Sequence, residues 1–279
     1  MKKLLSVLLC PVLLIPLSAC ADASGSTITL EGSTSTERVI SALIEGYHEN
    51  VNDIRINYSG TGSGAGIEAV LTGLCDIGLS SRALDESENA KGAVGHLVAL
   101  DCITVIIHPQ NPISDLTVQQ LQQIFTGKIT NWRQFGSRDA PIAVYGREAG
   151  SGTRGAFENL LGIYDRCTYT NEYGSNGDIV GNVSTNPNAI GYVSLSSVRN
   201  GAKIISLGGI ICNEENVRSG VYPLQRPFLM VTDKNRPLSP QAQAFLDYTL
   251  SRSVAEYIAI AGAIAPDRSN GESYEKNTT

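Results

Sequence analysis

A dense group of anion-binding residue types lies in the segment YGREAGSGTRGAF, at positions 145–157. Arg147 supplies a planar cation with a fork of N–H donors, and Ser151, Gly152 and Thr153 precede an apolar pattern typical of a helix. The first backbone N–H groups of a helix have no partner inside it, and the helix dipole adds positive potential there. The segment therefore predicts a site for an oxyanion.

Two further clusters repeat this chemistry. The segment GSTSTE contains Thr34 and Ser35, and the segment SGTGSGAG contains Ser63. Each cluster follows a predicted strand and precedes a predicted helix, and such turns gather where ligands bind in an open α/β sheet. Serine and threonine are also ordinary helix caps, and Thr34 with Glu37 fits a capping box. Because three clusters occur and two are dense in glycine, we favour a shared anion site over capping alone.

The pattern argues against an enzyme that transfers or hydrolyses phosphate. In the P-loop pattern the second glycine would fall on Ser151, and the position before Thr153 holds glycine instead of lysine. The segment TGSGAG also lacks the spacing of a dinucleotide-binding loop. A serine hydrolase would need a nucleophile elbow and a histidine base, yet His48, His96 and His108 lie far from the clusters in sequence. An enzyme acting on a phosphate ester is the alternative class, and no cofactor is expected.

The elements that must position these clusters alternate between strand-like and helical patterns, which is typical of α/β organisation. Strands are predicted at 28–30, 55–59, 76–81, 98–108, 142–146, 189–195, 203–207 and 227–233. Helical stripes are predicted at 39–47, 67–74, 121–125 and 157–164, with further helices after Ser239 and before Gly262. The segment 98–108 is longer than one strand usually needs, so it could begin in one lobe and end in another.

The N-terminal residues read as an export signal, with two lysines, an apolar run and the sequence LSAC ending at Cys20. This ending resembles a bacterial lipobox, in which Cys20 is lipid-modified and becomes the mature N-terminus. We therefore expect residues 1–19 to be a lipoprotein signal peptide and 20–26 a flexible tether. The protein would be lipid-anchored on the extracytoplasmic side of the cell membrane. An ordinary signal peptide ending near a cysteine is the alternative.

Removal of residues 1–19 would leave 19 basic against 27 acidic side chains, a formal net charge of −8. A surface this acidic argues against nucleic acid as a partner and against a polybasic membrane patch. It leaves an anionic ligand open, because binding depends on the local site.

Four further cysteines, Cys75, Cys102, Cys167 and Cys212, permit two disulfides in an exported chain. We favour the pairs Cys75–Cys102 and Cys167–Cys212, because each would stay inside one lobe, with free thiols as the alternative. No CxxC pattern is present and the histidines do not cluster with the cysteines, so no metal site is expected.

Six motifs in chain order resemble those of the phosphate-binding subunit of the bacterial phosphate ABC transporter. They are GSTST, SGTGSGAGI, DIGLSSR, FTGKITNW, REAGSGTR and NPNAIGYVSL, and the resemblance covers roughly residues 27–265. It implies an α/β, two-lobed, periplasmic-binding-protein-like fold of type II, with the lobes joined by a two-segment hinge. Lobe 1 would comprise 27–102 and 227–266, lobe 2 would comprise 103–226, and we expect a disordered tail at 267–279.

The resemblance implies a monomer that binds inorganic phosphate and delivers it to ABC permease subunits, with their ATPase, for import. The phosphate ligands it implies are Thr34, Ser35, Ser63, Ser81, Arg147, Ser151, Gly152 and Thr153. Many members of the family carry an aspartate at the position of Ser81. Here Ser81 or a backbone carbonyl would have to accept the proton of phosphate, and we expect phosphate to be preferred over sulfate. Binding of sulfate or molybdate by a protein of the same shape is the alternative.

Overall fold

The computed structural model describes residues 27–198 and 201–268. The expected signal peptide, Cys20 and the tether lie outside the described residues, as does most of the expected disordered tail. No helix within the described ranges is long and apolar enough to cross a membrane.

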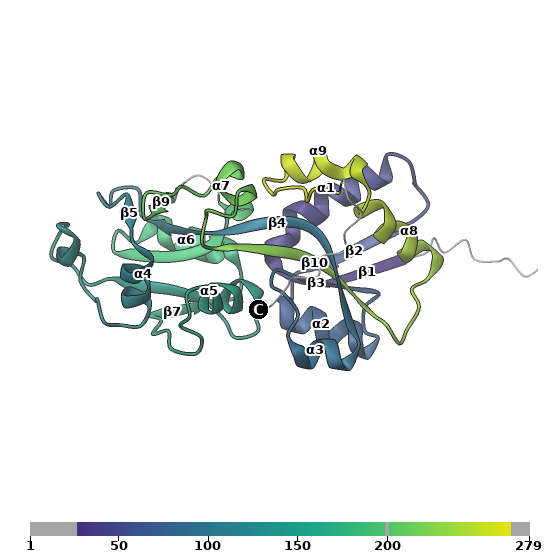
Figure 1. Ribbon diagram of the computed structural model, residues 1–279, viewed down its shortest axis with the longest axis horizontal. Coiled ribbons are helices and arrows are strands. Elements are labelled where there is room, and N and C mark those ends of the chain that lie inside the picture. The colour runs from purple at the N-terminus through teal and green to yellow at the C-terminus, as the bar shows by residue number, and fades with distance from the viewer. Residues whose placement is uncertain (1–26, 199–200, 269–279) are drawn as a thin grey trace, which may run out of the picture.

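Two strands connect two groups of helices and strands, which form the two lobes (Figure 1). Strand β4 (Ala93–Ile107) pairs antiparallel with β10 (Gln225–Asp233) along residues 93–102, and then pairs with β8 (Ala189–Ser194) from residue 103 onwards. The overlong apolar segment is therefore one strand that leaves the first lobe and enters the second. This is the two-lobed α/β organisation that the sequence predicts.

The first lobe contains the parallel strands β1 (Thr27–Gly32), β2 (Arg55–Ser59) and β3 (Ile77–Ser80), and the sheet order is β2-β1-β3-β10-β4. Its helices are α1 (Glu37–His48), α2 (Ser63–Thr72), α3 (Glu86–Lys91), α8 (Pro240–Thr249) and α9 (Ala255–Ile260), with the 3-10 turns η1 (Thr34–Thr36) and η4 (Arg252–Val254). Val39, Ile40 and Leu43 recur at helical spacing on α1 and pack on the sheet. Burial of each such side chain contributes about 1.5–3 kcal/mol.

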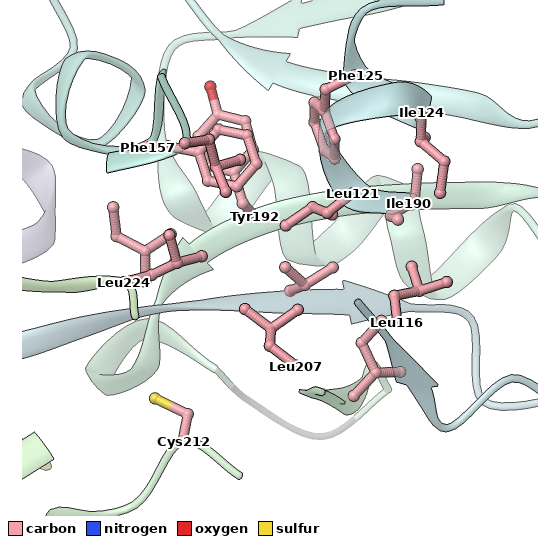
Figure 2. Close-up of a cluster of buried hydrophobic side chains, with 14 of the residues drawn as sticks. Leu116, Leu121, Ile124, Phe125, Phe157, Ile190, Tyr192, Leu207, Cys212 and Leu224 are labelled. Carbon is pink, nitrogen blue, oxygen red and sulfur yellow. The ribbon is translucent and has the colours of Figure 1, made fainter. Parts of the chain in front are cut away.

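The second lobe contains the strands β5 (Asp115–Leu116), β6 (Ala143–Arg147), β7 (Asn171–Tyr173) and β9 (Lys203–Leu207) beside β8. Its helices are α4 (Val118–Phe125), α5 (Gly152–Leu160), α6 (Asn176–Thr185) and α7 (Glu214–Arg218), with the 3-10 turns η2 (Trp132–Phe135) and η3 (Leu195–Ser197). Phe157 of α5 stacks on Tyr192 of β8, with ring centroids 3.8 Å apart, and Phe125 packs edge-on against Phe157 (Figure 2). This packing fixes the position of α5, whose N-terminus carries the third cluster.

The expected cysteine pairing is wrong. The structure has one disulfide among the described residues, between Cys102 and Cys212, while Cys75 and Cys167 are free. The crossing strand β4 carries Cys102 into the apolar cluster of the second lobe, where Cys212 also lies. The residue that seemed to end the first lobe therefore pairs with the second.

Two helical stripes end earlier than predicted. Leu74 is 76% exposed and Tyr164 is 58% exposed, although both continue an apolar spacing. Helix α2 ends at Thr72 because Gly73 adopts a left-handed backbone with φ of 80°, a conformation that glycine tolerates. Helix α5 likewise ends at Leu160, before Tyr164.

Candidate anion-binding site

The three predicted clusters meet where the lobes face each other. The Ser35 hydroxyl, after β1, lies 2.7 Å from the Thr153 hydroxyl on α5. The amide of Gly64, on α2, donates to the carbonyl of Gly150 at 3.1 Å. Helix starts from opposite lobes are thus brought together, and with them the positive ends of their dipoles.

The start of α5 is built by its glycine and serine residues. Gly150 has a positive φ of 82°, which turns the chain into the helix. Ser151 is the N-cap, and its hydroxyl accepts from the amide of Arg154 at 3.4 Å. Thr153 is buried, with its hydroxyl directed at Ser35 of the other lobe. Ser151 therefore caps the helix.

The start of α2 has a different design. Gly62, with a φ of 98°, is the N-cap, and it offers no side chain to the helix N–H groups. The buried hydroxyl of Ser63 accepts instead from the amide of Ser81 at 3.1 Å. Because no side chain caps them, the first N–H groups of α2 can donate to a ligand or to the facing lobe.

Thr34 does not form the capping box that its spacing with Glu37 allows. The N-cap of η1 is Ser33, whose hydroxyl accepts from the amide of Ser35, and α1 starts without a side-chain cap. The Thr34 hydroxyl oxygen is buried and has no hydrogen-bond partner among the described residues. A buried hydroxyl without a partner is costly, so this atom is suited to a ligand oxygen.

Gly152 is required at its position by the facing lobe. A Cβ atom there would overlap the Ser63 side chain and would lie 2.8 Å from the Ser81 hydroxyl oxygen. Gly152 thus lies where α5 packs closely against the first lobe.

Arg147 ends β6 and is 2% exposed. Its Nε donates to the carbonyl of Tyr173 at 3.0 Å and its Nη2 to the carbonyl of Gly174 at 2.5 Å. No carboxylate forms a salt bridge with it within the described ranges. Burial, together with a smaller contribution from the nearby Arg226, lowers the pKa of Arg147 to about 10. A buried cation without a counter-charge favours binding of an anion.

A polar network holds the backbone of Arg147 at the end of β6. The amide of Arg147 donates to the Tyr192 hydroxyl at 3.3 Å, and Arg154 donates to the carbonyl of Arg147 at 3.0 Å. Arg154 is paired in turn with the buried carboxylate of Glu158 at 2.8 Å, which also accepts from Tyr169. Arg154 therefore supports the backbone of Arg147 instead of facing solvent.

Two residues of the site were not predicted. Arg226 of β10 and Asp101 of β4 are opposite each other in the strand register and form an ion pair at 2.8 Å, with both side chains buried. The guanidinium also donates to the hydroxyls of Ser35 at 3.0 Å and Ser81 at 3.2 Å. One charged residue inside each apolar crossing segment was the signal that could have found this pair.

Two more contacts across the lobes were also missed. The side-chain amide of Asn176, at the start of α6, donates to the Ser35 hydroxyl at 2.8 Å. Arg38 of α1 donates to the carbonyl of Ser196 at 2.8 Å. The start of α6, in the second lobe, is thus a fourth helix start that contacts the clusters.

A pocket of 560 Å³ adjoins the site on the side of Arg226 and Ser151. Two further arginines line it, but both are already paired: Arg82 with Glu88 at 2.6 Å, and Arg154 with Glu158. Within the described ranges no group of three or more His, Cys, Asp or Glu residues could hold a metal ion.

Comparisons with known proteins agree with this geometry. A family model described as a PBP superfamily domain matches residues 18–253. The phosphate-binding protein PstS of Bacillus subtilis (strain 168) is 31% identical over 241 residues, covering 85% of this chain and 79% of that protein. A crystal structure from Clostridium perfringens, described as a phosphate ABC transporter substrate-binding protein with bound phosphate, is 36% identical with a TM-score of 0.84. It covers 87% of this chain and 100% of that one. A phosphate transport receptor of the ABC type from Vibrio cholerae is 34% identical with a TM-score of 0.71, covering 86% of this chain and 100% of that one.

Proposed function

We propose, from the premise that the chain belongs to the PstS phosphate-binding family of the PBP superfamily, that it binds inorganic phosphate outside the cytoplasm and delivers it to an ABC permease for import. The observation that carries this proposal is the buried Arg147, which has no carboxylate partner among the described residues and lies at the end of β6, beside the start of α5. A bound oxyanion would supply the counter-charge that Arg147 lacks.

In the proposed complex, Arg147 binds two phosphate oxygens through its planar fork. The hydroxyls of Thr34, Ser35, Ser63 and Thr153 and the helix N–H groups of Gly152 and its neighbours donate to the remaining lone pairs. Ser151 caps the start of α5, and it lines the adjoining pocket. The proposed role is capture of the ion without chemistry.

We further propose that binding closes the two lobes by a hinge in the crossing strands. The expected lobes are 27–102 with 227–266, and 103–226, so the hinge would lie where β4 and β10 pass between them. Closure excludes water and strengthens each charge contact in the site. The contacts between Ser35 and Thr153 and between Gly64 and Gly150 support a closed arrangement of this kind.

Retention at the membrane through a lipid on Cys20 is also part of the proposal. A single acyl chain gives only marginal anchoring, so more than one chain on Cys20 would be needed. Labelled palmitate should be incorporated into the wild-type chain in a bacterial host and should be lost in Cys20→Ser. Incorporation that persists in Cys20→Ser would contradict this part. We also propose a monomer, because all of the proposed phosphate ligands belong to one chain.

The direct test of phosphate binding is equilibrium dialysis with labelled phosphate. We expect saturation at one phosphate per chain, and no release of phosphate from a generic phosphate ester. Absence of retained phosphate at millimolar concentration would contradict the proposal, and sustained ester hydrolysis would favour an enzyme instead.

A further inference from the structure

The buried guanidinium of Arg226 donates hydrogen bonds to Asp101, Ser35 and Ser81. It is 3% exposed, and Asp101 neutralises its charge. Nε donates to Asp101, Nη2 donates to Ser35 and lies 2.8 Å from the Asp101 carboxylate, and Nη1 donates to the carbonyl and hydroxyl oxygens of Ser81. All three nitrogens of the guanidinium are therefore engaged as donors. Arg226 adds no net charge to the site, but it determines which way the neighbouring hydroxyls can bond.

The Ser81 hydroxyl is fixed as a donor by this arrangement. Its oxygen accepts from Arg226 at 3.2 Å and from the Ser33 hydroxyl at 2.8 Å. A hydroxyl oxygen has two lone pairs, so both acceptor positions of Ser81 are filled. Its own proton can only be donated, towards Ser63 at 3.4 Å or towards a bound ion. Ser63 already accepts from the amide of Ser81, and a second bond from Ser81 would make it a donor to the ion as well.

The Ser35 hydroxyl is also fixed as a donor. It accepts from Arg226 at 3.0 Å and from the side-chain amide of Asn176 at 2.8 Å, which fills both lone pairs. Its proton is directed at Thr153 or at the ion, and a Thr153 hydroxyl that accepts it must donate onwards. Both arms of the Arg226 guanidinium therefore orient hydroxyl protons into the site.

We propose that Ser81, held by Arg226 and Ser33, is a donor to the bound anion and that no side chain among the described residues of the site is then a fixed acceptor for the proton of hydrogen phosphate. This inference rests on the proposed function. Rejection of sulfate needs a buried acceptor that cannot itself donate, because such a group is left unpaired against an unprotonated ion. The free hydroxyl of Thr34 does not supply this, since it can rotate and donate to either ion. The carboxylate of Asp101 is occupied by Arg226 and Ser194.

The chemical consequence is a site for tetrahedral dianions in general. Sulfate and hydrogen phosphate carry the same charge when phosphate has lost its second proton. The oxygens of either ion can accept hydrogen bonds from the donors of the site. The proton of phosphate then gains no bond that sulfate lacks, and the preference for phosphate over sulfate that the family resemblance predicts is largely removed.

Calorimetric titration of the wild-type protein, Ser81→Ala and Ser81→Asp with phosphate and with sulfate at about pH 8 tests this proposal. We expect the wild type to bind the two ions within about tenfold of each other, whereas a fixed acceptor would give a ratio of about 10⁴ or more. Ser81→Ala should weaken both ions by the same factor, about 10- to 100-fold for a bond to a charged group. Ser81→Asp supplies a fixed acceptor and should raise the ratio in favour of phosphate at least about 100-fold.

The outcomes separate this proposal from the proposed function. A wild-type preference for phosphate above about 10³ would overturn the inference and leave phosphate binding intact. Weakening of phosphate alone in Ser81→Ala would show that Ser81 accepts, and would also overturn it. Failure of the wild type to bind either ion would instead contradict the proposed function itself.

Discussion

Gly152 at the start of α5 lies against Ser63 at the start of α2, so closely that a Cβ atom on Gly152 would overlap the Ser63 hydroxyl. The two residues belong to different lobes and are 89 positions apart in the sequence. Their contact joins the start of a helix in the first lobe to the start of a helix in the second lobe. It also explains why glycine stands between two hydroxyl residues in the third cluster.

Gly152→Ala should prevent the lobes from closing while leaving each lobe folded. The added methyl group meets the Ser63 side chain, and the Ser81 hydroxyl at 2.8 Å. We expect phosphate affinity to fall at least about 100-fold, since the donors of α5 are held away from those of α2. Gly155→Ala is the matched control, because its Cβ would meet Arg82 at an ordinary 3.5 Å. Equal affinities for the two variants would contradict the assigned contact.

Thr34→Val should separate ligand binding from stability. The Thr34 hydroxyl is buried without a partner among the described residues, so its replacement by a methyl group should leave the free energy of unfolding unchanged or raised. Phosphate affinity should fall by about 1.5–3 kcal/mol, the size of a hydrogen bond to a charged group. Chemical denaturation and titration of the same preparation measure both. Thr72→Val, at the exposed end of α2, should alter neither quantity by more than about 0.5 kcal/mol.

Removal of one partner from the Asp101–Arg226 pair should be strongly destabilising. Both side chains are 1% exposed, so Asp101→Ala leaves a buried cation without compensation. We expect the free energy of unfolding to fall by about 3–5 kcal/mol, measured by urea denaturation. The double variant Asp101→Ala/Arg226→Met should lose less than the sum of the two single variants. Asp139→Ala breaks the exposed pair with Arg133 and should cost below about 1 kcal/mol. A similar small loss in Asp101→Ala would be evidence against a buried pair.

Phosphate affinity should fall at high pH because of Arg147. Burial lowers the pKa of this group to about 10 in the free protein, and a bound anion favours its charged form and raises that pKa. Affinity is therefore full below about pH 10 and declines as the pH rises further, since binding then requires uptake of a proton. Titrations at about pH 10 in two buffers of different ionisation enthalpy count that proton. Binding without proton uptake under these conditions would contradict a lowered pKa for Arg147.

Local chemistry in the sequence predicted part of the fold, and it indicated the three clusters that the structure brings together. Glycine and hydroxyl clusters between strand and helix patterns indicated Thr34, Ser63 and Ser151 because a helix start needs no distant residue to be recognised. The overlong apolar segment indicated the crossing strand. Helix ends were less predictable, since a single glycine at position 73 outweighs the apolar spacing that continues to Leu74.

The parts that could not be predicted depend on contacts between distant segments. The pairing of Asp101 with Arg226 follows from the register of two strands whose residues are 125 positions apart. The disulfide between Cys102 and Cys212 follows from where the crossing strand enters the second lobe. The direction of the Ser81 hydroxyl follows from two donors on other elements. None of these relations leaves a periodic signal in the sequence.

The central claim is that Arg147 holds a phosphate ion, and calorimetric titration of three proteins with phosphate tests it most directly. The wild-type chain should bind one phosphate. Arg147→Ala should lose about 3–5 kcal/mol of binding free energy, the cost of breaking a buried charge pair. Arg133→Ala, which removes an exposed arginine of the same lobe, should bind as the wild type does. A loss below about 0.5 kcal/mol in Arg147→Ala, the size of an ordinary surface substitution, would contradict the account.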